Sequence, residues 1–216
     1  MNLPNKLTIL RIILVPIMVI IPFLGIKGEL CGIPIAYLLV DLIFVIAAIT
    51  DKLDGHIARS RNQITTFGKF LDPIADKIVV IAAMIMLVEF GHLPAWIPII
   101  VIFREFIVSG YRLVAVQKEG NVIAASIWGK MKTVTQMVAV ILAFIDPNPY
   151  GTIFEGNLSG YVFGINLLVT LMMSVSIVAT IFSGWEYIKN GKELFKDSMW
   201  EVILWNLKMQ KTGLKS

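Results

Sequence analysis

The chain has 216 residues, of which 57% are hydrophobic and 16% are charged, and its formal net charge is +4. Soluble domains carry roughly 45–50% apolar and about 25% charged residues, so this composition excludes an ordinary soluble protein and indicates an integral membrane protein. The single cysteine, Cys31, excludes an internal disulfide and a cysteine-based metal site. The first apolar run is followed by no small-residue cleavage site, so we expect no cleavable signal peptide.

Six apolar runs are long enough to be candidate membrane spans, roughly 7–24, 33–50, 71–90, 93–113, 127–145 and 161–183. They predict an all-α, polytopic membrane protein with six transmembrane helices, organised as a single domain over residues 1–216. All lysines and arginines except Lys27 lie in four segments: the N-terminus, residues 51–77, residues 104–132 and the C-terminus. The positive-inside rule then places both termini in the cytoplasm.

The first run opens with Asn5, Thr8 and Arg11 at helical i, i+3, i+6 spacing, so the three residues share roughly one face. Two interpretations stay open. The segment is an interfacial helix start with an arginine that reaches back to the membrane surface, or it is a polar face turned toward a functional site.

The second run is apolar except for Asp41. Ten residues separate it from Asp51, which is about 15 Å of helix, so Asp41 falls near the middle of the membrane. An ionisable group there is costly and commonly functional, but the sequence indicates no partner. We expect a structural role or an oligomer contact and do not place Asp41 in the site.

The next three runs contain only short pieces without charge, Ile78–Val88, Leu93–Phe103 and Thr133–Ile145. Each piece is under about 20 Å of helix, whereas the hydrocarbon core is about 30 Å thick. The polar ends of these helices must therefore enter the cytoplasmic half of the bilayer and face the bundle interior. The residues predicted to converge on one cytoplasm-facing intramembrane cavity are Asp72, Asp76, Arg104, Glu105, Arg112, Lys130 and Lys132.

The last run is free of charge and is predicted to be scaffold, and residues 184–216 form a lysine-rich cytoplasmic tail. Within the tail, Trp200, Ile203, Leu204 and Leu207 share one helical face. This pattern predicts a helix on the membrane surface or a short segment packed on the bundle. The role of residues 197–216 is not determined by the sequence.

Four aspartates cluster around the second connection. Asp51 and Asp54 are at i, i+3 spacing and Asp72 and Asp76 at i, i+4 spacing, so each pair shares a helix face. Carboxylates without nearby thiols or imidazoles suit a hard divalent cation such as Mg²⁺ or Mn²⁺, and two ions could share the four groups. The alternative is a salt-bridged loop with Arg59 and its basic neighbours.

Eight residues at fixed spacing, from Asp51 to Asp76, resemble the signature of the CDP-alcohol phosphotransferases. The matching positions are Asp51, Asp54, Gly55, Ala58, Arg59, Gly68, Asp72 and Asp76. The resemblance implies attack by an alcohol hydroxyl on the β-phosphorus of a CDP-linked group, with release of CMP. It implies that Asp51, Asp54 and Asp72 hold two metal ions with help from Asp76, which is also the general base. Gly55, Ala58, Arg59 and Gly68 would border the CDP moiety.

Basic residues bear on the identity of the alcohol. Arg104 and Arg112 lie about 12 Å apart along one helix, and Lys130 and Lys132 begin the next. Such a cluster would suit an acceptor that carries its own phosphate. The alternative is that Arg104 pairs with Glu105 or a metal-site aspartate and that the lysines are ordinary flanking anchors.

Further motifs resemble the bacterial phosphatidylglycerophosphate synthases within that family: Asn5-x-x-Thr8-x-x-Arg11, Arg104-Glu105-Phe106 with Arg112, and Gly129-Lys130-x-Lys132-Thr133. This resemblance implies CDP-diacylglycerol and sn-glycerol 3-phosphate as substrates, with Asn5 and Thr8 also near the CDP-lipid. It implies a homodimer in the bacterial cytoplasmic (inner) membrane, and no nucleic acid partner.

Two other functions are weighed against this one. A related enzyme could use serine or inositol phosphate as the acceptor. An ion transporter would also place charged residues inside spans. Against transport, the polar residues stop halfway across the membrane, and the outer halves of the third to fifth runs are apolar.

Overall fold

A computed structural model of the chain describes residues 3–60, 66–119 and 127–211, with side chains described for 5–51, 71, 73–111 and 127–189. The described part is mostly helical. Its helices are α1 (Leu3–Ile20), α2 (Ile35–Ser60), α3 (Thr66–Glu89), α4 (Trp96–Glu119), α5 (Ile127–Ile145) and α6 (Gly160–Lys211), with short 3₁₀ helices η1 (Ile21–Leu24) and η2 (Thr152–Glu155). Each of the six predicted apolar runs lies mainly in one of the helices α1 to α6.

Three helical segments in the described part are long and apolar enough to cross a membrane: Asn5–Leu24, Ile127–Ile145 and Gly160–Lys189. The chain is therefore a membrane protein by the length and composition of its helices. In α4 the pair Arg104–Glu105 interrupts the apolar sequence, as the short charge-free pieces predict for this run.

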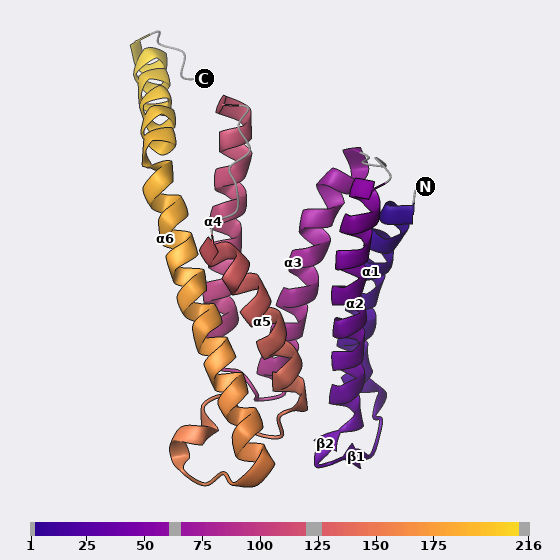
Figure 1. Ribbon diagram of the computed structural model, residues 1–216. Coiled ribbons are helices and arrows are strands. Elements are labelled where there is room, and N and C mark those ends of the chain that lie inside the picture. Colours follow the sequence, from indigo (N-terminus) through magenta and orange to yellow (C-terminus); the bar gives the residue numbers. More distant parts are fainter. Residues whose placement is uncertain (1–2, 61–65, 120–126, 212–216) are drawn as a thin grey trace.

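The helices run side by side as an elongated bundle, with the two ends of the chain at the same end of the molecule (Figure 1). At the opposite end, a two-stranded hairpin joins α1 to α2, with β1 (Glu29–Leu30) antiparallel to β2 (Ile33–Pro34). Its two-residue turn has positive φ at Cys31 (54°) and Gly32 (79°). This is the turn class whose twist matches antiparallel strands, and the sequence analysis did not predict the hairpin.

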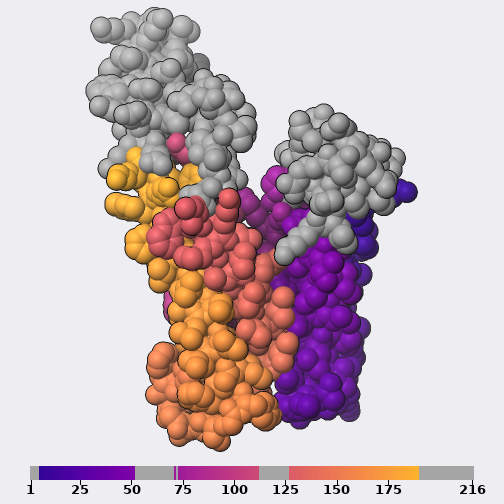
Figure 2. Space-filling view, viewed as in Figure 1, coloured from indigo at the N-terminus to yellow at the C-terminus, as the bar shows by residue number. Residues whose placement is uncertain are grey.

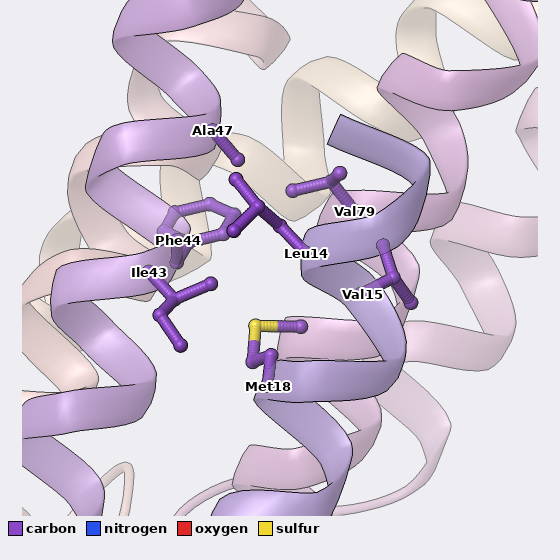
Figure 3. A pocket seen from close by; sticks show the side chains of 7 residues that line it. All are labelled: Leu14, Val15, Met18, Ile43, Phe44, Ala47 and Val79. Atoms are coloured by element: carbon purple, nitrogen blue, oxygen red, sulfur yellow. The ribbon is translucent and has the colours of Figure 1, made fainter. Parts of the chain in front are cut away.

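The apolar core packs between α1, α2, α3, α4, α5 and the first part of α6. Phe44, Met84, Leu87, Phe144 and Met173 in this core are almost fully buried. Figure 3 shows a crevice within this core, lined only by apolar side chains: Leu14, Val15, Met18, Ile43, Phe44, Ala47 and Val79. Without a polar group to orient a ligand, this crevice is part of the helix packing.

Asp41 lies inside the bundle and is 7% exposed. Its Oδ1 has no hydrogen-bond partner among the described residues. A residue buried within one chain is poorly placed to contact a second copy, so the structure favours a structural role for Asp41 over an oligomer contact.

The last helix is longer than the predicted sixth span. α6 continues from Gly160 to Lys211 as one helix of 52 residues. No proline interrupts this stretch, so the backbone ladder can continue where the apolar sequence ends. The segment expected to form a surface helix is joined to it, and the side chains beyond Lys189 lie outside the described residues.

A buried amide joins α5, the following loop and α6 at the hairpin end of the bundle. Asn166, which is 0% exposed, donates from Nδ2 to Asp146 Oδ2 (2.7 Å) and to the Pro149 carbonyl (2.9 Å). Its Oδ1 accepts from the Ile153 backbone N–H at 2.9 Å. Buried polar groups need such partners, so this one side chain satisfies three groups of the loop.

We predict that Asn166→Leu destabilises the protein by about 2–4 kcal/mol, because it leaves buried partners unsatisfied at about 1–3 kcal/mol each. For a chain of this size the midpoint of thermal unfolding in detergent should fall by roughly 5–10 °C. Asn157→Leu, at an exposed position in the same loop, is the matched control. An unchanged midpoint in Asn166→Leu would contradict the assignment.

Candidate active site

An arginine from α1 lies between two of the signature aspartates. Arg11 is 1% exposed, and its Nη1 lies 3.0 Å from Asp51 Oδ1 on α2 and 2.5 Å from Asp76 Oδ1 on α3. One nitrogen therefore holds together the carboxylates of two helices. Asn5 and Thr8 are also buried. The polar face of α1 is turned into the bundle, and the interpretation of Arg11 as a surface-seeking residue is wrong.

The remaining signature residues are placed by their backbone alone. Asp54, Gly55, Ala58 and Arg59 lie on α2, and Gly68 and Asp72 lie on α3. Their side chains are outside the described residues, as is the side chain of Arg112 on α4. Among the side chains that the structure does describe, no three acidic, histidine or cysteine residues form a group that could hold a metal.

The donor chemistry nevertheless fits a hard cation. Asp51 and Asp76 supply carboxylate oxygens from two helices, and both point at one positively charged group. Oxygen donors converging on a positive charge are the arrangement that Mg²⁺ and Mn²⁺ require. The charge is supplied here by Arg11. Asp51 and Asp76 are 38% and 46% exposed, so both remain accessible to a ligand.

A cavity of about 820 Å³ lies beside the carboxylates, between α3, α4, α5 and α6. In Figure 2, α5 and α6 form one side of the described surface, and α1 and α2 form the other. The charged residues that line the cavity are Asp76, Lys77, Arg104, Glu105, Lys130 and Lys132. The grouping predicted from the short apolar pieces is therefore present for the members whose side chains are described, and Lys77 joins it.

Glu105 is the centre of an ion network in this cavity. Its Oε1 lies 2.7 Å from Lys132 Nζ and 2.9 Å from Arg104 Nη1, and its Oε2 lies 3.5 Å from Lys77 Nζ. Glu105 is 13% exposed and Lys132 is 8% exposed. Three cations from three helices thus surround one carboxylate in a place where solvent screens little.

Arg104 is also fixed from the α6 side. Its Nη2 donates to the Ser183 hydroxyl, and its guanidinium carbon lies 5.9 Å from the ring centre of Tyr187. The expected alternative, a pairing of Arg104 with Glu105, is present. It does not remove Arg104 from the cavity, because both residues line it. Lys132 is buried, unlike an ordinary flanking anchor, whereas Lys130 is exposed.

Two participants were not named as site residues from the sequence. Helical spacing places Arg11 on one face with Asn5 and Thr8. The spacing does not show which residues of other helices this face contacts. Lys77 directly follows Asp76 and was counted only as a charge at the end of a span. The signal in the sequence is the short charge-free piece Ile78–Val88. Because this piece is too short to cross the bilayer by itself, Lys77 is expected to lie in the same half of the membrane as Glu105.

Two partly exposed carboxylates bridged by a buried arginine lie next to a basic cavity within a helical bundle, and such a site suits an enzyme that handles phosphate esters. Residues 1–182 match the family described as CDP-alcohol phosphatidyltransferase, and the chain belongs to this family. Enzymes of the family generally depend on a divalent metal.

Individual relatives point to one branch of this family. The chain is 43% identical over 204 residues to a CDP-diacylglycerol–glycerol-3-phosphate 3-phosphatidyltransferase of Bacillus subtilis, which covers 91% of this chain and 98% of the relative. An enzyme of the same name from Haemophilus influenzae is 37% identical over 92% of this chain and 97% of its own. A probable phosphatidylglycerophosphate synthase of Mycobacterium tuberculosis is 35% identical over 87% of this chain and 80% of its own.

Proposed function

We propose that the protein transfers the phosphatidyl group of CDP-diacylglycerol to sn-glycerol 3-phosphate, giving phosphatidylglycerophosphate and CMP. The observation that carries the proposal is one cavity lined by Asp76 and by Lys77, Arg104 and Lys132. An acceptor that carries a hydroxyl and a phosphate monoester could place its hydroxyl at Asp76 and its phosphate among the cations. The names of the relatives support the same pair of substrates.

The predicted site residues would have two roles, to hold the metal ions and to bind the CDP-lipid. Asp51, Asp54, Asp72 and Asp76 would hold two divalent ions, Mg²⁺ or Mn²⁺, and the bound ions would neutralise the charge of the diphosphate. Asn5, Thr8, Gly55, Ala58, Arg59 and Gly68 would border the CDP-lipid.

In the transfer, Asp76 takes the proton of the acceptor hydroxyl. The acceptor oxygen forms a bond to the β-phosphorus, the bond from this phosphorus to the bridging oxygen breaks, and CMP leaves. Phosphoryl transfer depends mainly on positioning and charge neutralisation. Arg104, Arg112, Lys130 and Lys132 would provide the positioning by holding the acceptor phosphate.

The membrane arrangement follows from the charge distribution. We propose six spans, with both termini and the mouth of the cavity on the cytoplasmic side of the bacterial inner membrane. The cavity would then admit the lipid tails from the bilayer and the soluble acceptor from the cytoplasm. Residues 1–216 would form one catalytic membrane domain with a cytoplasmic tail from 184, and a homodimer is proposed by family resemblance.

The test is an acceptor screen with the purified protein, CDP-diacylglycerol and Mg²⁺ or Mn²⁺, with CMP release as the readout. We expect turnover with glycerol 3-phosphate and none with glycerol or serine. Inositol phosphate is the second candidate, because it also carries a phosphate monoester that the cations would accept. Equal turnover with glycerol or serine would overturn the proposed acceptor.

Lys132→Met is predicted to raise KM for glycerol 3-phosphate by about 10- to 100-fold, since a charge-assisted hydrogen bond contributes about 1.5–3 kcal/mol. The KM for CDP-diacylglycerol should change by less than about threefold, because that substrate would lie at the aspartates. Lys189→Met, at an exposed position on α6, is the control. Equal effects on both substrates would indicate general damage to the fold.

A further inference from the structure

The positive and negative charges of the ion network in the cavity do not balance. Glu105 supplies one negative charge to three positive ones, on Lys77, Arg104 and Lys132. Two positive charges remain uncompensated within this set. At a site within one half of the membrane, such an excess of positive charge is energetically costly unless a bound anion compensates it.

The network also has hydrogen-bond donors to spare. A lysine ammonium has three donors and an arginine guanidinium has five. Lys132 and Arg104 each use one on Glu105, and Arg104 uses another on Ser183. Arg104 Nε is buried and has no hydrogen-bond partner among the described residues. Donors that remain after the network is formed can bind a ligand with several acceptor oxygens.

Neighbouring helices fix two of the three cations, Lys77 and Arg104, at a second point. Lys77 Nζ donates to the Ser109 hydroxyl, which in turn donates to the Glu105 carbonyl at 2.6 Å. Arg104 is tied to α6 through Ser183, and Gly184 leaves space for its side chain, since a Cβ there would meet Arg104 Cγ at 3.4 Å. Glu105 is thus the common partner of cations from α3, α4 and α5.

We propose that Glu105 is a positioning residue for the acceptor and that Lys77 is a further ligand of the acceptor phosphate. This inference rests on the proposed function. Glu105 holds three mutually repelling cations close together and leaves a residual charge of two positive, which a phosphate monoester dianion neutralises. Without the carboxylate, the cations would separate by repulsion, and the site would favour an anion of higher charge.

The first test is the kinetics of Glu105→Gln in the full-length protein. We expect KM for glycerol 3-phosphate to rise by about tenfold or more, with KM for CDP-diacylglycerol within about twofold, and partial recovery in Glu105→Asp. Glu155→Gln, at an exposed position in the loop before α6, is the matched control. Lys77→Met should raise the same KM by about tenfold, and it keeps the test decisive if Glu105→Gln does not fold.

The second test measures charge preference, which a purely structural role would not alter. The trianion 3-phosphoglycerate serves as a competitive inhibitor against glycerol 3-phosphate. In Glu105→Gln, the inhibition constant divided by KM for glycerol 3-phosphate should fall by about tenfold relative to the wild type.

The results distinguish a failure of this inference from a failure of the proposed function. If the wild-type protein turns over glycerol 3-phosphate but KM stays within about twofold in both Glu105→Gln and Lys77→Met, the inference is overturned and the proposed function stands. If the wild-type protein releases CMP only with acceptors that lack a phosphate, the proposed function fails first.

Discussion

Asp76→Asn is expected to lower CMP release by about 10³-fold or more, the largest effect that we predict for a single substitution. An asparagine cannot take the proton of the acceptor hydroxyl, and loss of general-base catalysis alone costs about 10²- to 10⁴-fold. The substitution also removes a charged oxygen from the group that would hold the metal. Asp76 is the residue common to the carboxylate pair bridged by Arg11 and to the basic cavity, so its loss affects both.

The measurement is single-turnover release of CMP from CDP-diacylglycerol with saturating glycerol 3-phosphate. Binding of glycerol 3-phosphate, followed by calorimetry, should change by less than about threefold, because the cations around Glu105 are intact. Glu29→Gln, at an exposed position in the hairpin, is the control for removing a carboxylate. Removal of divalent ions with EDTA should abolish wild-type activity, and Mg²⁺ or Mn²⁺ should restore it. Activity of Asp76→Asn near the wild-type level would exclude the residue as base.

The helices could be predicted from the sequence because apolar runs separated by charged connections leave a membrane chain few alternatives. The inward placement of Arg104, Glu105 and Lys132 was also predictable, since the apolar pieces beside them are too short to span. The end of the last helix was not predictable in this way. Hydropathy marks where a span ends, but a helix ends where a breaker or cap occurs, and α6 contains no proline.

The contacts across helices could not be predicted, because they depend on helix rotation. Lys77 and Glu105 are separated by a complete connection, and their meeting depends on how α3 and α4 are turned about their axes. Arg11 is a similar case. Its spacing from Thr8 defines a face, but only packing of α1 against α2 and α3 determines that this face meets Asp51 and Asp76.

Arg11→Met is the second substitution with a large expected effect, and it acts on stability in a metal-dependent way. Arg11 is almost fully buried and compensates two carboxylates from different helices. Without it, these carboxylates repel each other in the metal-free protein, and breaking a buried pair costs about 3–5 kcal/mol. Because Asp51 and Asp76 are partly exposed, we expect a smaller loss of about 1–3 kcal/mol, or roughly 2–10 °C in the unfolding midpoint.

The sign of the metal response distinguishes two roles for Arg11. If its guanidinium occupies the place of a divalent ion, removing it leaves the carboxylates uncompensated, and the affinity for Mn²⁺ should rise by about tenfold. Since a ligand stabilises the state that binds it, saturating Mn²⁺ should then raise the unfolding midpoint more in Arg11→Met than in the wild type. Arg11→Lys, which keeps the charge, should respond as the wild type does. Weaker Mn²⁺ binding in Arg11→Met, followed by electron paramagnetic resonance of the free ion, would show instead that Arg11 positions Asp51 and Asp76 as ligands of the bound metal.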